Sequence, residues 1–211
     1  MCPSLVGRAF RPAICAALAC IGLAAPSRAT AQTPTLASTS DWRRFPTVAA
    51  DVVSRWQPDN ASTPVVTGTG PAIQVQTTTP ATLLRTDWTL SGIYAAGATF
   101  TPAPDVAPTE FGVSVGDGAL ACIVAPDGTV RFEVHGSTLS VGTIGAEHGA
   151  ATEILVRVSD KAVTCDVNGQ TAVTLAPMAL AGAPGIYVGK SGLVLVAGFT
   201  VETAANQTGG Q

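Results

Sequence analysis

Short runs in which apolar and polar residues alternate are the feature of this sequence that most restricts its fold. Because successive side chains of a β-strand point to opposite faces, this pattern predicts strands with one buried face. A sheet of such strands must cover its apolar face with a second layer. The clearest runs are residues 73–76, 110–115, 130–135, 153–158 and 163–168, and a weaker one places Trp88, Leu90 and Tyr94 on a further strand.

Turn-forming residues separate these runs. Asn168-Gly169 is the strongest hairpin signal, since both residues tolerate positive φ, and we predict that it joins residues 161–167 to 170–175. Pro126-Asp127-Gly128 and Asp117-Gly118 supply two further tight links. The chain has 22 Gly and 15 Pro among its 211 residues. Roughly ten to twelve short strands with a turn about every ten residues predict an all-β sandwich.

One segment near the start of the domain shows helical spacing. Val48, Val52 and Trp56 recur every four residues between two prolines, as in a short helix with sharp ends. The alternative is an irregular arm that packs Trp42 and Trp56 on a sheet edge. The sequence leaves both interpretations open.

Residues 1–31 have the layout of a secretory signal peptide. Two arginines precede an apolar run at residues 13–25, and Ala29-Thr30-Ala31 forms a cleavage site. The run is too short to span a bilayer. Two alternatives stay open: an anchor that remains attached, and lipid modification at Cys20. We expect a linker at residues 32–40, a domain at 41–203 and a disordered tail at 204–211.

Removal of this leader changes the charge and the cysteine count. The chain has 11 basic and 14 acidic residues, and the leader contains three arginines and no acid, so 8 and 14 remain, a net charge of −6. That balance argues against nucleic acid or anionic membranes as partners. No later stretch is apolar for eighteen residues, so no membrane span is expected, and the mature protein should be secreted or periplasmic.

Two cysteines remain in the mature chain. Cys122 and Cys165 share parity with apolar neighbours, so both should face the core. An even number of cysteines suits an oxidising compartment. They are either bridged or two buried thiols.

Several motifs occur in an order that resembles the concanavalin A-like lectin/glucanase superfamily, and most of all its laminin G-like and glucanase-like bacterial extracellular domains. They are the pair Trp42 and Trp56, then Leu83-Leu84-Arg85-Thr86-Asp87-Trp88, Phe111-Gly112-Val113-Ser114-Val115, Asp127-Gly128-Thr129-Val130-Arg131-Phe132, Val167-Asn168-Gly169, Gly185-Ile186-Tyr187-Val188-Gly189 and Val196-Ala197-Gly198-Phe199-Thr200-Val201. The resemblance covers most of residues 42–202. It implies a jelly-roll sandwich of two curved antiparallel sheets, with ligands often held on the concave sheet or at its rim.

Catalytic motifs are missing from the sequence. The Glu-x-Asp-x-x-Glu strand of the related glucanases does not occur, nor does a Gly-x-Ser-x-Gly elbow. No Cys or His pair has zinc-ligand spacing, and no dense acidic loop suits calcium. We therefore predict no catalytic residue, metal or cofactor. A glycoside hydrolase with a carboxylate pair formed across strands remains an alternative.

The candidate binding residues form a polar stripe. Arg131, Glu133 and His135 alternate with apolar residues, and Glu110 is their companion from another strand. On a concave sheet they could bind a glycan or another cell-surface polymer; the alternative is an ordinary solvated face with an Arg–Glu pair. We infer a secreted, non-catalytic binding module. The alternatives are an enzyme and a structural or interaction protein of the envelope. Aromatic candidates for stacking on a sugar are Trp42, Trp56, Tyr94 and Tyr187.

Overall fold

The computed structural model describes residues 42–46, 50–59, 63–69, 72–107, 109–145 and 150–204, all within the compact unit Pro34–Gln211. The side chains of residues 42–46, 50–52 and 69 are not part of this description. The expected signal peptide and linker, residues 205–211 of the expected tail, and Val48 lie outside the described residues.

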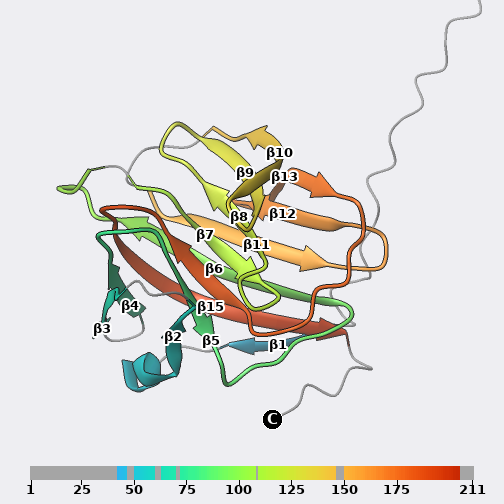
Figure 1. Cartoon of the computed structure of the whole chain (residues 1–211), viewed down its shortest axis with the longest axis horizontal. Helices are drawn as coiled ribbons and strands as arrows, with labels where there is room; N and C mark the ends of the chain where they lie inside the picture. The colour runs from blue at the N-terminus through green and yellow to red at the C-terminus, as the bar shows by residue number, and fades with distance from the viewer. Residues whose placement is uncertain are drawn as a thin grey trace, which may run out of the picture. The chain divides into compact units, whose positions relative to one another are not determined.

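The described chain is almost entirely β-structure (Figure 1). A single 3₁₀ helix, η2 (Ala50–Arg55), precedes the second strand. The strands are β1 (Trp42–Pro46), β2 (Trp56–Pro58), β3 (Val65–Thr69), β4 (Ala72–Gln76), β5 (Ala81–Arg85), β6 (Tyr94–Pro102), β7 (Phe111–Val115), β8 (Leu120–Val124), β9 (Thr129–Val134), β10 (Ser137–Thr143), β11 (Thr152–Val158), β12 (Val163–Val167), β13 (Gln170–Leu175), β14 (Gly185–Val188) and β15 (Leu193–Ala204).

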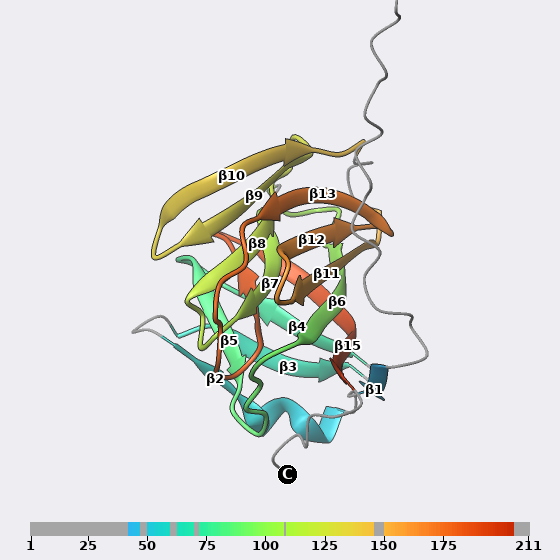
Figure 2. The same ribbon diagram turned by 90° about the vertical axis from the view of Figure 1, so that its right-hand side faces the viewer.

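The strands form two antiparallel sheets that face each other (Figure 2). Sheet A has the order β13-β12-β11-β6-β15-β4-β3, with β1 added beside β15. Sheet B has the order β10-β9-β8-β7-β14-β5-β2. The chain crosses repeatedly between the sheets, as a jelly roll does, and the predicted all-β sandwich of two curved sheets is confirmed.

The core lies between the sheets and is filled from both inner faces. Phe100 of sheet A stacks on Phe111 of sheet B with ring centroids 5.2 Å apart. Buried and less buried residues alternate along β11, as the sequence pattern predicted, whereas β7, β8 and β12 are buried at every position. The space between the sheets is lined by fully buried residues of both sheets. They include Val113, Leu120, Phe132, Ile154, Val156 and Val201. No helix in the described part of the chain is long and apolar enough to cross a bilayer.

The segment with helical spacing contains both a helix and an edge strand. The helix ends at Arg55, and Trp56 begins β2 at the edge of sheet B, where it is 8% exposed. Its ring meets Phe199 edge-on at 5.0 Å, and the buried Arg85 guanidinium lies 5.3 Å from its centre. Trp56 is therefore core, and a full α-helix does not form.

The strand predicted through Trp88 and Leu90 is wrong. The chain turns after β5, and the Trp88 N–H donates to the Arg85 carbonyl at 3.1 Å. Asp87 accepts hydrogen bonds from the buried Arg85 at 2.8 and 2.7 Å, which fixes this turn. Alternating apolar residues here reflect a loop packed on the core, and Tyr94 begins the next strand.

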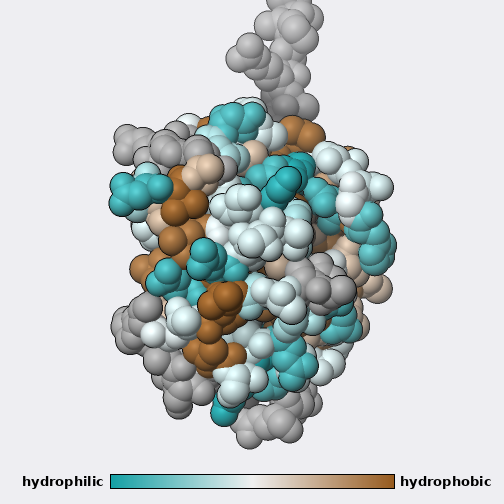
Figure 3. Space-filling view, turned by 60° about the vertical axis from the view of Figure 1, so that its left-hand side comes forward, coloured by the Kyte–Doolittle hydropathy of each residue, from teal (hydrophilic) through white to brown (hydrophobic). Residues whose placement is uncertain are grey.

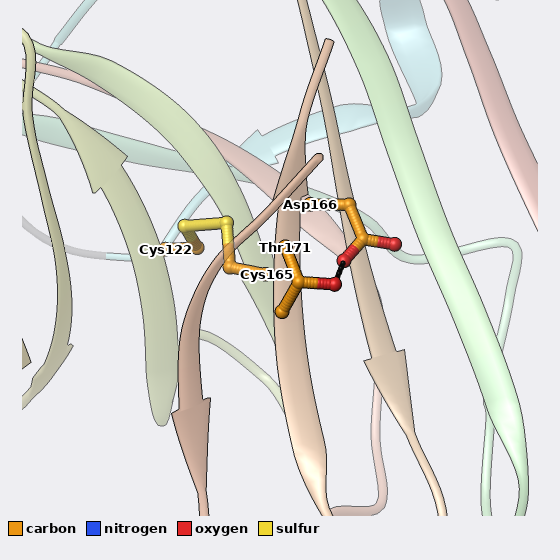
Figure 4. The surroundings of a disulfide bond; sticks show 4 residues. All are labelled: Cys122, Cys165, Asp166 and Thr171. Carbon is orange, nitrogen blue, oxygen red and sulfur yellow. Dashed lines mark hydrogen bonds between the residues drawn. A yellow bond between two sulfur atoms is a disulfide. The ribbon is translucent and has the colours of Figure 1, made fainter. Parts of the chain in front are cut away.

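A disulfide joins the two sheets through the core. Cys122 of β8 and Cys165 of β12 are fully buried and bonded, with Cα atoms 6.2 Å apart. Figure 4 shows the bridge on one side of β12, whereas Asp166 points away from it and accepts a hydrogen bond from Thr171. Of the two possibilities that the sequence left open, the structure has the bridge.

We expect the disulfide to stabilise the domain strongly. It closes a loop of 43 residues, worth about 4 kcal/mol in the chain-entropy model. In a chain beginning at Gln32, Cys122→Ala and Cys165→Ala should each lower the free energy of unfolding, and the double variant should cost little more than either. Two reactive thiols in the denatured, unreduced protein would contradict the bridge.

The Asn168-Gly169 hairpin is confirmed. Val167 pairs with Gln170, and the two turn residues have φ of 50° and 77°. A β-branched side chain in this region is strained. A Cβ at Gly169 would meet no atom within 4 Å, so only backbone strain opposes a substitution there.

Gly169→Val should lower the free energy of unfolding by about 1–2 kcal/mol. Gly145 is the matched control, because a Cβ there also meets nothing within 4 Å and its φ lies outside the left-handed region. Denaturant unfolding of both variants makes the comparison. Equal stabilities for Gly169→Val and Gly145→Val would count against the strain.

Candidate ligand-binding face

The outer face of sheet B carries the candidate site. One row of cross-strand neighbours runs over five strands, with every member pointing away from the core: Val141 of β10, Arg131 of β9, Ile123 of β8, Gly112 of β7 and Tyr187 of β14. These residues point outward because their neighbours along each strand, such as Val130 and Phe132, are buried in the core.

Arg131 brings two of the predicted residues together. Its Nη1 and Nη2 donate to Oε1 and Oε2 of Glu110 at 2.8 and 2.9 Å, a bidentate pair. Its Nε donates to Oε2 of Glu133 at 3.1 Å. The side chains are 17%, 33% and 21% exposed for Arg131, Glu110 and Glu133. Charge-assisted bonds of this kind hold planar groups in one orientation.

The arginine reaches Glu110 by crossing β8. Glu110 immediately precedes β7, and β8 lies between β7 and β9. The aliphatic part of Arg131 therefore passes over β8, where its cross-strand partner Ile123 is fully buried although it points outward. A Cβ at Gly112 would lie 2.0 Å from the Cys122 carbonyl oxygen, so only glycine allows this close approach of β7 to β8.

Tyr187 completes the cluster. It is half-buried between two fully or nearly buried residues of β14, and its cross-strand neighbours are the small Gly112 and Thr82. Burial raises the pKa of Tyr187 to about 12, with further contributions from the charges of Glu110 and Glu133 and a hydrogen bond to Glu110. The hydroxyl therefore stays protonated at neutral pH.

His135 does not join the cluster. Val134 pairs with Ser137, so His135 and Gly136 form the two-residue loop between β9 and β10, with φ of 46° and 80°. The expected extension of the polar stripe to His135 is wrong, because the strand ends one residue earlier. The apolar–polar alternation continued into a turn whose left-handed backbone the pattern could not reveal.

Tyr187 is the functional candidate that the polar-stripe argument missed. Its signal was its position between Ile186 and Val188, which gives it outward parity on a strand. The other aromatic candidates for which side chains are described, Trp56 and Tyr94, are buried in the core. The side chain of Trp42 lies outside the description.

A second charged cluster and a hollow lie away from this face. On the outside of sheet A, Arg157 pairs with the buried Asp166, which Thr171 also contacts at 2.6 Å. A hollow of about 300 Å³ lies before β6, lined mainly by apolar loop residues such as Ile93 and Met178. Among the described residues, no group of three His, Cys, Asp or Glu side chains could hold a metal ion.

The surface around these elements is mixed. On the face shown in Figure 3, small hydrophobic patches are scattered among hydrophilic residues. The large apolar side chains that are exposed in the described chain are Val65, Leu139, Val141 and Leu195. Val141 lies directly beside Arg131 in the row on sheet B, which gives the polar cluster an apolar neighbour.

Comparisons with known proteins establish the fold. No family model matches the chain, and no curated protein sequence does. A carbohydrate-binding module, CBM66 from Bacillus subtilis, is 12% identical, with a TM-score of 0.58 over 74% of this chain and 98% of that one. A Bacillus subtilis protein of unknown function with a galectin-like fold is 11% identical, with a TM-score of 0.60 over 78% and 96%.

A third similar structure is the exoplasmic/lumenal domain of VIP36 with Ca²⁺ and Man3GlcNAc bound. It is 8% identical, with a TM-score of 0.51 over 82% of this chain and 92% of that domain. Identities this low show the fold alone. The chain has a jelly-roll fold, as the resemblance of its sequence motifs implied.

The tyrosines give a pH-dependent test of the site. The chain has two, and burial raises the pKa of Tyr94 as well. Because folding favours the neutral phenol, stability is fully present below the unfolded pKa of about 10 and falls as pH rises toward 12. Absorbance at 295 nm should show no tyrosinate in the native protein at pH 10.5. One full tyrosinate at that pH, with the fold intact, would contradict the burial of Tyr187.

Proposed function

We propose that this protein is a secreted, non-catalytic jelly-roll module that binds a glycan or another cell-surface polymer on the outer face of sheet B. The observation that carries the proposal is the cluster of Glu110, Arg131 and Glu133 beside Tyr187, which we call the Arg131 cluster. Its members come from β9, β14 and the residue before β7, and ion pairs hold the three charged side chains on an accessible face.

The Arg131 cluster has the chemistry that sugar recognition uses. Carboxylates accept hydrogen bonds from sugar hydroxyls, and charged hydrogen bonds are about twice as strong as neutral ones. A phenol ring offers apolar area together with a polar tip, which suits a sugar ring with its C–H and O–H groups. Because Arg131 fixes both carboxylates in advance, little side-chain entropy is lost when a ligand binds.

The similar structures support this role. CBM66 is named as a carbohydrate-binding module, and the VIP36 domain was solved with Man3GlcNAc. Fold similarity by itself does not transfer function, so the proposal depends on the residues of the Arg131 cluster. The disulfide supports export, since such bonds persist in oxidising compartments.

Hydrolysis is a second candidate, favoured by one observation. Glu110 and Glu133 are the cross-strand carboxylate pair that the sequence left open, because both bind the same guanidinium. A glycosidase needs one of its two carboxyl groups to donate a proton to the leaving oxygen. Both oxygens of Glu110 instead accept hydrogen bonds from Arg131, which favours binding over catalysis.

Binding to an array of glycans, followed by calorimetry, tests the proposal. We expect Arg131→Ala and Tyr187→Ala to weaken binding at least tenfold, because they remove the orienting group and the ring. Arg157→Ala is the matched control: Arg157 also pairs with a carboxylate on an outer strand face, but on sheet A. It should leave affinity unchanged.

Melting temperatures of the variants separate lost binding from lost folding. Glycan binding that Arg131→Ala and Tyr187→Ala both leave intact would overturn the proposed site. Release of reducing sugar by the unmodified protein, lost in Glu110→Gln and Glu133→Gln, would favour the hydrolase instead.

A further inference from the structure

We propose that the Arg131 cluster selects uncharged or amino-bearing sugars and rejects acidic polymers such as uronates and sulfated glycans. This inference rests on the proposed function and adds the chemical class of its ligand. It follows from the net charge of the cluster and from which of its atoms already take part in hydrogen bonds.

The single guanidinium of the cluster is already neutralised. Arg131 donates three hydrogen bonds to two carboxylates, one bidentate and one single. An acidic sugar would have to compete with Glu110 and Glu133 for the same cation. Two carboxylates against one guanidinium leave the cluster with a net charge of −1.

Neighbouring charges do not reverse this sign. Asp127 on the turn before β9 is close enough to feel the charge of Arg131, although hydrogen bonds from Thr129 are the main reason for its lowered pKa. Lys190 is exposed on the turn after β14, beyond Gly189. Counting both, three carboxylates face two cations, and the net charge is still −1.

The atoms left for a ligand accept hydrogen bonds. Glu133 uses Oε2 for Arg131, and no bond to a protein group is described for its Oε1. Sugar hydroxyls and ammonium groups can donate to such an oxygen, whereas carboxylates and sulfates cannot. Like charges brought together also repel, and this repulsion weakens as salt screens it.

Matched neutral and acidic probes test the selection. The neutral and amino-bearing set is mannan, β-1,3-glucan, amylose, chitin oligomers and chitosan oligomers; the acidic set is polygalacturonate, alginate and heparin. The neutral polymer that binds most tightly is also oxidised at its primary hydroxyls to carboxylates, so that the two members of that pair differ only in the group at this one carbon of each sugar. We expect the oxidised form to bind at least tenfold more weakly in 20 mM NaCl, and the gap to narrow in 500 mM NaCl.

Variants assign the effect to the cluster. Glu133→Gln removes one negative charge while keeping the shape, and it should narrow the gap between the neutral polymer and its oxidised form at least threefold. Glu153→Gln makes the same charge change on sheet A, where Glu153 is exposed, and should leave the gap unchanged.

The outcomes separate this inference from the proposed function. Equal or tighter binding of the oxidised form to the unmodified protein would overturn the charge selection and leave glycan binding standing. An unchanged gap in a folded Glu133→Gln protein would also overturn it. Failure of every probe to bind, with the fold intact, would overturn glycan binding itself.

Discussion

Burial of one face of each sheet against the other is the constraint on which the other features of this molecule depend. It assigns every strand residue to the core or to an outer face, since successive side chains alternate. Cys122 and Cys165 can bridge the sheets because both lie on inner faces, whereas Arg131 and Tyr187 are displayed because both lie on outer ones. A shift of one residue in any register would exchange these roles.

Three arginines illustrate how the surroundings of a side chain determine its role. Arg85 is 1% exposed, lies against the Trp56 ring and fixes the turn after β5 through Asp87. Arg157 pairs with a buried carboxylate on sheet A. Arg131 alone of the three binds two carboxylates, one on its own strand and one just before β7, beside a half-buried tyrosine. The first two arrangements are complete within the protein, and the third leaves an acceptor oxygen for a ligand.

Much of the fold could be predicted from the sequence because apolar and polar residues alternate in it with a period of two. The sandwich, the Asn168-Gly169 hairpin and the inward parity of both cysteines follow from local patterns. Whether the cysteines meet depends on which strands face each other, which no local pattern contains. The same alternation misplaced Trp88, where a loop packs on the core, and His135, where the strand turns.

Part of the site could be predicted from the same alternation of residues. Arg131, Glu133 and Glu110 share outward parity, and an arginine two residues from a glutamate on one strand suggests a pair. That Glu110 reaches the same guanidinium depends on strand order and on Gly112, which lets β7 approach β8 closely. Tyr187 is part of the site because of the strand order of sheet B: β14 lies beside β7, although 70 positions separate Val115 at the end of β7 from Gly185 at the start of β14.

The central claim is that ligands bind to the outer face of sheet B at the Arg131 cluster. A crystal structure of the protein with its tightest-binding oligosaccharide tests this claim most directly. We expect a sugar ring over Tyr187, with a hydroxyl within hydrogen-bond distance of Glu133 and the Arg131–Glu110 pair retained. A sugar bound on sheet A, or in the hollow beside Ile93 and Met178, with the Arg131 cluster empty, would contradict it.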